Sequence, residues 1–451
     1  MFKFTTLRGR CSVLRFVLLA LVLLALVHLH FSLPPGAKLY RPKWSWIPRF
    51  SSSRFFHKNG YFNQACDALP GADRIVITVK TGATEAFEKV PVQMLTSLLC
   101  APNVYVFSDM AQKIGDIQIY DALDTIPSSV TDGNTDFDIY RMQQKLQDHP
   151  EKIASVLRGM RDPRRPDDLA AWTLDKYKNL HIIEKTWALQ PDMDWYLHID
   201  ADTYVVWPSL IEWLQRLDPS KDAFLGSLSL INDLPFAHGG SGILLSGVAM
   251  RNFLVTHNGT IERWDPKVHD NCCGDWILAQ ALKECGTDVM NSWPTINGEP
   301  PSTIPFDNDH WCQPVVTMHH VSPVEAQQLG NFEQQRLNKS KPLIYSELFM
   351  SFFADNIPEQ MEDWDNTSGD ATVLHIHSAE ECAKACAKKE DCFQSLYNGE
   401  ECTLGTKSIV FGKKREPEGG KKWQSSWNTT RIKEWIANQE SCDALKFPYQ
   451  D

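Results

Sequence analysis

The sequence predicts an α/β fold, with a mostly parallel, twisted sheet flanked by helices, followed by a small disulfide-rich α+β module. Residues 74–82 and 103–109 are β-branched and aromatic runs, and a helical pattern at 93–99 lies between them. A third apolar run, 195–199, follows a longer helical pattern. Alternating strands and helices are typical of parallel sheets. Beyond residue 366, four closely spaced cysteines indicate a module held together by disulfides.

Local patterns predict the individual strands and helices. The first two strands end at the polar residues Thr81 and Asp109, and the carboxyl ends of parallel strands share one edge of a sheet. A helix is expected over 167–189, where apolar residues recur at spacings of three and four, and Pro191 ends it. The charged segment 132–168 is expected to be a surface insertion. With 43% hydrophobic residues, the chain can bury a sizeable core.

The N-terminus predicts membrane insertion. Residues 1–15 carry four basic side chains and precede the apolar run 16–33. A signal anchor at 16–33 would leave 1–15 in the cytosol and the rest of the chain in the lumen. A cleaved signal peptide is the alternative, although no compact small-residue cleavage site follows the run. The stretch 34–70, rich in Pro, Ser, Lys and Arg, is then a stem, and 71–350 is the large α/β domain.

Cysteines and glycosylation signals predict the same compartment. Eleven of the 12 cysteines lie beyond the predicted anchor, and disulfides persist in oxidising compartments. Because eleven is odd, one cysteine either stays free or bridges to another chain, which would link a homodimer. All four Asn-x-Ser/Thr signals also lie on the predicted luminal side, at Asn258, Asn338, Asn366 and Asn428.

The charge of the chain argues against nucleic acid as a partner. The formal net charge is −11, and no long basic run is present. Aromatic residues are not interleaved with Lys or Arg, as they are in grooves that bind single strands.

Two acids follow the third strand at a spacing that can hold one cation. Asp200 and Asp202 emerge directly after the run 195–199, with Ala201 between them. Hard divalent ions such as Mg²⁺ and Mn²⁺ take carboxylate oxygens and keep positions open for the oxygens of a diphosphate. The alternative is that one of the acids caps the next turn.

The C-terminal cysteines are expected to form a separate module over 366–430, followed by a tail over 431–451. Cys382 and Cys386 would lie on one face of a helix and staple it to strands. The four cysteines allow three pairings. Zinc fits poorly, because paired Cys-x-x-Cys knuckles are missing and the compartment is oxidising. The four cysteines of this module are Cys382, Cys386, Cys392 and Cys402.

Several of these motifs occur in the order seen in one enzyme family. The chain resembles the glycosyltransferases of family 31, the group of Fringe and the core 1 β-1,3-galactosyltransferase, over roughly 72–322, and is most similar to its fungal members. The resemblance implies the nucleotide-sugar-binding fold of GT-A type, one metal, and inversion at the anomeric carbon. The C-terminal cysteine pattern resembles PAN/Apple modules. The motifs that carry the family resemblance are Val79-Lys80-Thr81, Phe107-Ser108-Asp109, Asp200-Ala201-Asp202-Thr203-Tyr204-Val205 and His238-Gly239-Gly240-Ser241-Gly242.

The resemblance implies a manganese site. Asp202 falls on the family's metal ligand, and Asp200 falls on an acid that contacts the donor and helps to hold the metal. Ala201 departs from the third acid that many members carry there. In the segment Met318-His319-His320-Val321-Ser322, His319 best matches the family's metal-binding histidine and His320 is the fallback. Neutral imidazole suits manganese.

The catalytic base is expected to be Asp275. It matches the second acid of a family pair, and Gly274 replaces the first. In an inverting transfer one carboxylate takes the proton from the attacking acceptor hydroxyl. The alternative is that Asp275 caps a helix over 276–282.

Other residues are assigned around the donor. In the family, the loop with Gly239, Gly240 and Gly242 lines the sugar pocket, and the alternative is an ordinary turn before a helix over 246–253. Thr81 and Asp109 match strand ends that the family uses around the uracil base and the ribose. Four tryptophans are candidates either for stacking on sugar or for the core, namely Trp195, Trp207, Trp276 and Trp311.

These observations predict an enzyme of the secretory pathway. It would be a single-pass type II Golgi membrane protein that transfers a hexose, galactose by expectation, from a UDP-sugar donor to a hydroxyl of a glycan or glycoprotein acceptor in β-1,3 linkage. N-acetylglucosamine and glucose are the alternative sugars, and a retaining transferase is an alternative mechanism. A non-catalytic protein that binds glycans is the alternative from another class, and the departures at Ala201 and Gly274 favour it.

Overall fold

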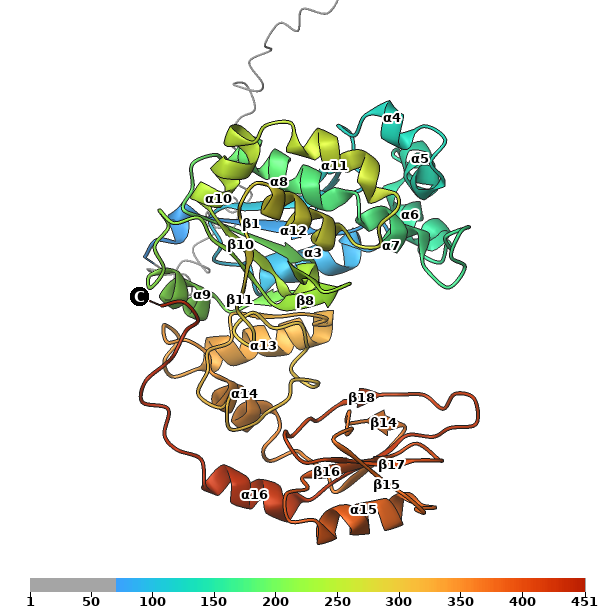
Figure 1. The fold of residues 1–451 in the computed structure, drawn as a ribbon, viewed down its shortest axis with the longest axis vertical. Coiled ribbons are helices and arrows are strands. Elements are labelled where there is room, and N and C mark those ends of the chain that lie inside the picture. Colours follow the sequence, from blue (N-terminus) through green and yellow to red (C-terminus); the bar gives the residue numbers. More distant parts are fainter. Residues whose placement is uncertain (1–69, 451) are drawn as a thin grey trace, which may run out of the picture. The chain divides into compact units, whose positions relative to one another are not determined.

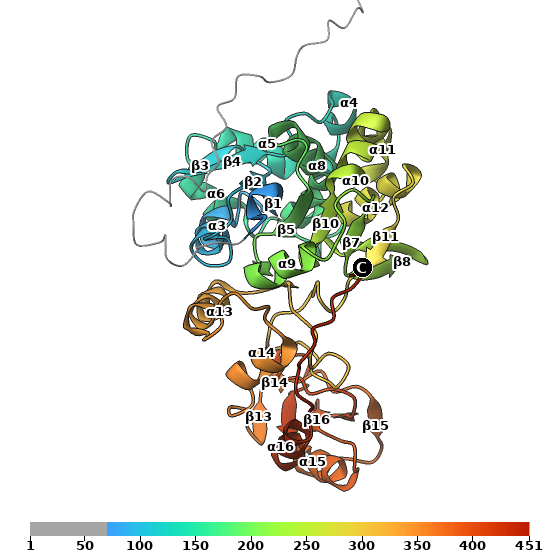
Figure 2. The same ribbon diagram turned by 90° about the vertical axis from the view of Figure 1, so that its left-hand side faces the viewer.

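The computed structural model describes residues 70–450, and an eight-stranded sheet forms the centre of the large domain (Figures 1 and 2). The strand order is β11-β7-β10-β5-β1-β2-β4-β3. Four of the neighbouring pairs are parallel, whereas β10 runs antiparallel to both β5 and β7, and β3 runs antiparallel to β4. The predicted mostly parallel sheet is confirmed. The strands are β1 (Ile75–Lys80), β2 (Val104–Ser108), β3 (Gln112–Ile114), β4 (Ile117–Asp121), β5 (Trp195–Asp200), β7 (Phe224–Gly226), β10 (Ile243–Ser246) and β11 (Val289–Asn291).

Helices cover both faces of this sheet. Along β1, Val76 points to one buried apolar cluster, and its neighbours Ile75 and Ile77 point to another. The first cluster includes α8 (Lys178–Leu189) and α12 (Gly274–Glu284), and the second includes α3 (Ala86–Leu95) and α9 (Trp207–Leu214). Burial on both faces explains why the strands are continuous apolar runs rather than alternating ones.

Helix boundaries differ from the predicted ones. The helix expected at 93–99 is α3, which begins earlier and ends at Leu95. Its Gln93 side chain is turned inward and donates to the backbone oxygens of Ala201 and Thr203. The helix expected over 167–189 is two helices, α7 (Ala170–Asp175) and α8.

The segment 132–168, expected as a surface insertion, contributes to the core. It forms α5 (Asp138–Lys145) and α6 (Pro150–Leu157), whose apolar side chains pack in the cluster that includes α8. Its Asp136 is buried and paired with Arg164 and Lys176. Some of the charged side chains that favoured an exposed segment therefore form ion pairs inside the protein. The remaining helices of the large domain are α4 (Ser128–Thr131), α10 (Gly247–Arg251), α11 (Thr260–Val268), α13 (Pro323–Gln335) and α14 (Tyr345–Phe352).

The C-terminal module is an antiparallel sheet with two disulfides. Its strand order is β13-β19-β16-β17-β15, and α15 (Ala379–Lys388) packs on it. The three open pairings reduce to Cys382–Cys402 and Cys386–Cys392. Its sheet strands are β13 (Gln360–Glu362), β15 (Ala371–Val373), β16 (Gln394–Tyr397), β17 (Cys402–Gly405) and β19 (Gln424–Trp427).

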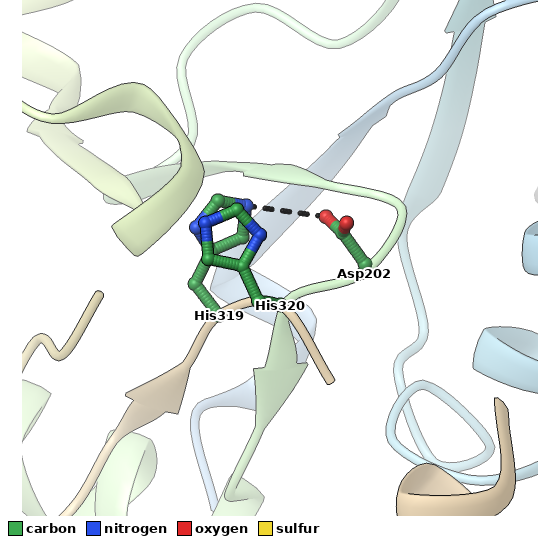
Figure 3. A group of neighbouring side chains, drawn as sticks. All are labelled: Asp202, His319 and His320. Atoms are coloured by element: carbon green, nitrogen blue, oxygen red, sulfur yellow. Dashed lines mark ion pairs between the residues drawn. The ribbon is translucent and has the colours of Figure 1, made fainter. Parts of the chain in front are cut away.

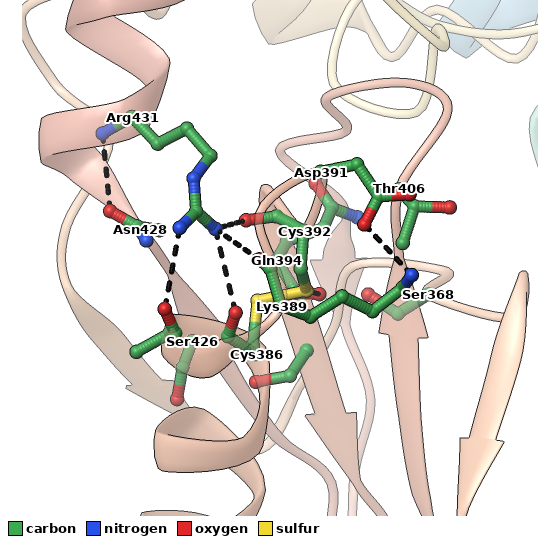
Figure 4. Close-up of a disulfide and its surroundings, with 12 residues drawn as sticks. Ser368, Cys386, Lys389, Asp391, Cys392, Gln394, Thr406, Ser426, Asn428 and Arg431 are labelled. Carbon is green, nitrogen blue, oxygen red and sulfur yellow. Dashed lines mark hydrogen bonds and ion pairs between the residues drawn. A yellow bond between two sulfur atoms is a disulfide. The ribbon is translucent and has the colours of Figure 1, made fainter.

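The helix α16 (Thr429–Ala437) crosses the predicted boundary at residue 430. Its Arg431 donates to the backbone oxygens of Lys389, at 2.8 Å, and of Cys392, beside the Cys386–Cys392 disulfide (Figure 4). The residues expected as a tail therefore include a helix anchored to the module.

The last described residues return to the large domain. Cys312 and Cys442 form a disulfide across 130 positions of sequence. Beyond it, Phe447 is buried in the apolar cluster that contains α9, and Trp213 of α9 donates to the backbone oxygen of Pro448.

Two other expectations concern cysteines and the membrane. Among the described cysteines, Cys285 is unpaired, and it is buried, which disfavours it as a bridge to a second chain. The predicted anchor 16–33 lies outside the described residues. Within 70–450, none of the helices has both the length and the apolar character to span a bilayer.

Candidate functional site

A cleft of about 680 Å³ lies where β1 and β5 end. Most of the residues predicted for the site line it, and two do not: Asp109 and Gly242. Gly242 immediately precedes β10 and has a φ of 114°, a backbone conformation that favours glycine. The predicted residues that line the cleft are Thr81, Asp200, Asp202, Gly239, Gly240, Asp275 and His319.

One end of the cleft holds a group of potential metal ligands. The ligand atoms of Asp202, His319 and His320 all lie within 4.8 Å of one another (Figure 3). The short strands β6 (Tyr204–Val205) and β12 (Thr317–Met318) pair antiparallel and bring the two histidines beside the turn that carries Asp202. In this arrangement Asp202 Oδ1 lies 3.2 Å from His319 Nε2.

The donor set of this group fits a divalent transition metal. Imidazole nitrogens and a carboxylate oxygen suit manganese and its neighbours. The buried Nδ1 of His319 has no hydrogen-bond partner among the described residues. Burial acts to raise the pKa of Asp202, but the hydrogen bond with His319 and the charge of Lys89, at 3.0 Å, hold that pKa below its usual range. In this arrangement Lys89 and His319 stabilise the charged form of the carboxylate.

Asp200 lies in a network of ion pairs rather than in the ligand group. Its Oδ1 is 3.3 Å from Lys80 Nζ, because β1 and β5 pair in register at these two residues. Lys80 also pairs with Asp175, which in turn lies 3.1 Å from Lys178. His320 thus occupies the place in the group that the sequence assigns to Asp200.

Asp109 supports the cleft from behind. It is fully buried, its Oδ1 accepts from the Ala83 N–H at 2.6 Å, and its Oδ2 lies 3.6 Å from Lys178 Nζ. The same lysine donates to the backbone oxygen of Thr81. These contacts hold the turn after β1, where the buried Thr81 hydroxyl has no partner among the described residues.

Asp275 lies in the first turn of α12. Its Oδ2 accepts from the Gly239 N–H at 2.8 Å. The alternative that Asp275 is the N-cap is wrong, because Cys273 occupies that position. The carboxylate is therefore tied to the glycine turn and faces the cleft.

The glycine turn separates Asp275 from the histidines. A Cβ at Gly239 would come within 3.2 Å of the Asp275 Cβ, and a Cβ at Gly240 would lie 2.1 Å from His319 Cε1. Any side chain at Gly240 would displace His319. The glycines therefore allow an acid and a ligand group to share one cleft.

Comparison with known families covers the first part of this site. Residues 71–285 match the family described as Fringe-like. This part of the chain is a Fringe-like domain. The domain is of the glycosyltransferase kind, so the match implies sugar transfer. The matched range includes Asp200, Asp202 and Asp275, and His319 lies beyond it. A search among curated proteins found no significant match.

The two departures in the Fringe-like domain have packing reasons. A Cβ at Gly274 would lie 2.4 Å from the backbone oxygen of Lys176 and 2.2 Å from Asn179 Nδ2, so α12 begins too close to α8 for an acid there. Ala201 is buried in the apolar cluster that contains α3 and α9. A third carboxylate at that position would lie in the core and not in the cleft.

Several cleft residues of the Fringe-like domain escape sequence reasoning. Of the four tryptophans considered for stacking, none lines the cleft, and three of them are buried. Trp172, which lies in the segment expected as a helix over 167–189, does line the cleft. Lys80 could have been predicted from the sequence, because a lysine at the end of an apolar strand needs an acidic partner nearby. The other unpredicted cleft residues include Lys89, Arg158, Asp175, Lys178, Cys272 and Cys273.

Proposed function

We propose that the Fringe-like domain transfers a hexose, galactose in first place, from a UDP-sugar to a hydroxyl of a glycan in β-1,3 linkage, with inversion. The observation that carries the proposal is the shared cleft. Asp275 and the group of Asp202 and His319 lie on either side of the turn at Gly239 and Gly240. An inverting transfer requires a base for the acceptor hydroxyl and a separate site for the diphosphate, and this cleft offers residues for both.

Asp202, His319 and His320 would hold a manganese ion, with Asp200 beside the donor. When bound, the ion would offset the negative charge that grows on the departing diphosphate. Lys89 and Lys80, which both line the cleft, add fixed positive charge near the same acids. At the nucleoside end, the Thr81 hydroxyl has no hydrogen-bond partner within residues 70–450 and would bind the uracil or the ribose.

Asp275 is the proposed base. Its Oδ2 is held by the Gly239 N–H, and this contact orients the carboxylate without neutralising it. The carboxylate would accept the proton of the acceptor hydroxyl as that oxygen attacks the anomeric carbon from the side opposite the diphosphate. Because the leaving group is a diphosphate, no second acid is needed to protonate it.

A screen of UDP-sugars tests the proposal. We expect UDP to bind only with Mn²⁺ present, measured by calorimetry, and UDP-galactose to be turned over faster than UDP-N-acetylglucosamine or UDP-glucose. A faster reaction with either alternative would correct the sugar, because selectivity rests on a few pocket contacts. The absence of any heat with UDP and Mn²⁺ would contradict the proposal and favour a glycan-binding protein without catalysis. The anomeric configuration of the product separates inversion from retention.

We also propose a type II Golgi location, and glycan occupancy tests it. Asn258 and Asn338 are exposed, and both should carry N-glycans. Asn366 is fully buried, and its Nδ2 donates to the backbone oxygen of Ser395, so a glycan there would prevent folding and the site should be empty. Mass spectrometry of glycopeptides from the secretory pathway measures all three. A glycan on Asn366 in folded protein would contradict the burial of this residue. The absence of glycans from both Asn258 and Asn338 would contradict the luminal location.

A further inference from the structure

An exposed aromatic side chain lies on one wall of the cleft. Trp172 is 52% exposed although it lines the same cavity as Asp275. Large exposed apolar groups in a cavity mark places where a ligand covers them. Leu169, at the beginning of the same helix, is also exposed and also lines the cavity.

A disulfide between neighbouring cysteines lies in the same cleft. Cys272 and Cys273 are bonded to each other immediately before α12, and both line the cavity. The bond converts two thiols into one apolar, polarisable group without a donor proton. Paired sulfurs cannot serve as metal ligands, so this group offers a contact surface and not a second metal site.

The tryptophan and the disulfide lie on segments that are tied together. Lys176, at the end of α7, donates to the backbone oxygens of His269 at 3.0 Å and Asn271 at 3.2 Å. The next residues, Cys272 and Cys273, are therefore fixed with respect to the helix that carries Trp172. We define the acceptor platform as Trp172 with the Cys272–Cys273 disulfide.

The contacts place the disulfide of this platform beyond Asp275 as counted from the ligand group, and the two hydrogen bonds of Lys176 hold α7 next to it. From the ligand group the order is His319, Gly240, Gly239 and then Asp275, each in contact with the next or joined to it in sequence. The disulfide follows at the N-terminus of the Asp275 helix. In an inverting transfer the diphosphate and the acceptor lie on opposite sides of the anomeric carbon, and the base contacts the acceptor.

We propose that the acceptor platform binds the apolar face of a pyranose ring in the glycan acceptor. A pyranose has a C–H face that packs on aromatic and sulfur atoms, while its hydroxyls remain at the edge. A ring held on the platform presents a hydroxyl to Asp275. This inference rests on the proposed function and adds the residues that select the acceptor.

Binding of simple glycosides tests the platform. The probes are p-nitrophenyl β-D-galactoside, N-acetyl-α-D-galactosaminide and α-D-mannoside, titrated by calorimetry into the full luminal chain with UDP and Mn²⁺ present. We expect at least one to bind, Trp172→Ala to weaken its affinity about tenfold, and Trp172→Phe to keep most of it. The paired change Cys272→Ser with Cys273→Ser should weaken it several-fold. Met350→Ala is the matched control, because Met350 is 46% exposed on α14 and lies outside the cleft.

The outcomes separate the platform from the proposed function. Affinity for UDP with Mn²⁺ should be the same in the Trp172 variants as in the unmodified protein, which shows that the donor end is intact. Unmodified protein that binds UDP but none of the three glycosides would overturn the platform alone. Unchanged glycoside affinity in Trp172→Ala would do the same. Failure of the unmodified protein to bind UDP would overturn the proposed function and, with it, the assignment of an acceptor.

Discussion

Replacing Asp202 with alanine is expected to abolish manganese-dependent turnover of UDP-sugar. Asp202 is the carboxylate of the ligand group, and its Oδ1 lies 3.2 Å from His319 Nε2. Its loss removes both an ion ligand and the negative charge that attracts the ion. We expect turnover to fall by about 10²–10³-fold, which is the cost of losing one preorganised electrostatic contact in a transition state. Initial rates at several Mn²⁺ concentrations measure the effect.

The fold should survive this change. Lys89, the other partner of Asp202, also lies 2.8 Å from Glu85, so it keeps a counter-ion when Asp202 is gone. The matched control is Asp288→Ala, which removes an exposed acid at the surface and should leave both stability and turnover unchanged. A folded Asp202→Ala protein with normal manganese-dependent turnover would show that the metal is held elsewhere.

Replacing Asp275 with asparagine is expected to remove transfer and leave UDP binding unchanged. Asparagine has nearly the same volume and keeps an oxygen that can accept from the Gly239 N–H, so the glycine turn stays in place. What it lacks is the capacity to take a proton and a second acceptor oxygen, since Oδ1 of Asp275 also accepts from the N–H of Trp276 at 2.8 Å. General base catalysis contributes about 10²–10⁴-fold, so transfer should fall by about 10³-fold, or ~4 kcal/mol of barrier.

Calorimetry with UDP and Mn²⁺ and a transfer assay on the same preparation measure the two effects. Asp270→Asn is the control, because Asp270 is an exposed acid in the loop just before α12. If Asp275→Asn lost UDP binding together with transfer, the residue would be holding the loop and not acting on the acceptor.

Much of the fold could be predicted because buried strands require apolar residues in continuous runs, which are easily recognised in a sequence. The strands around Val76 and Leu197 are covered on both faces, and only continuous apolar runs satisfy that condition. The helix boundaries were less predictable, because tertiary contacts set them. Gln93, expected at the start of a helix, lies near the end of α3, and its amide donates to backbone oxygens more than a hundred residues away.

The candidate site divides in the same way. Asp200 and Asp202 could be found because they follow a buried strand at a short spacing. The pairing of Asp200 with Lys80, and the proximity of His320 to Asp202, depend on strand register and on the chain's path after β12, which local pattern does not encode. Gly274 is understood only through Lys176, in the turn between α7 and α8, and through Asn179 of α8.

The disulfide between Cys312 and Cys442 links stability to the chemistry of the surroundings. It closes a loop of 130 residues, and in the chain-entropy view a cross-link of that span stabilises the folded state by about 5 kcal/mol. The total free energy of unfolding of a typical domain is only about 5–15 kcal/mol. In a reducing solution the same chain would lose a large share of this folding stability. The C-terminal end would then exchange between a state with Phe447 packed in the core and a state with it released. Oxidation of these two cysteines therefore fixes the C-terminal end to the domain that carries the cleft.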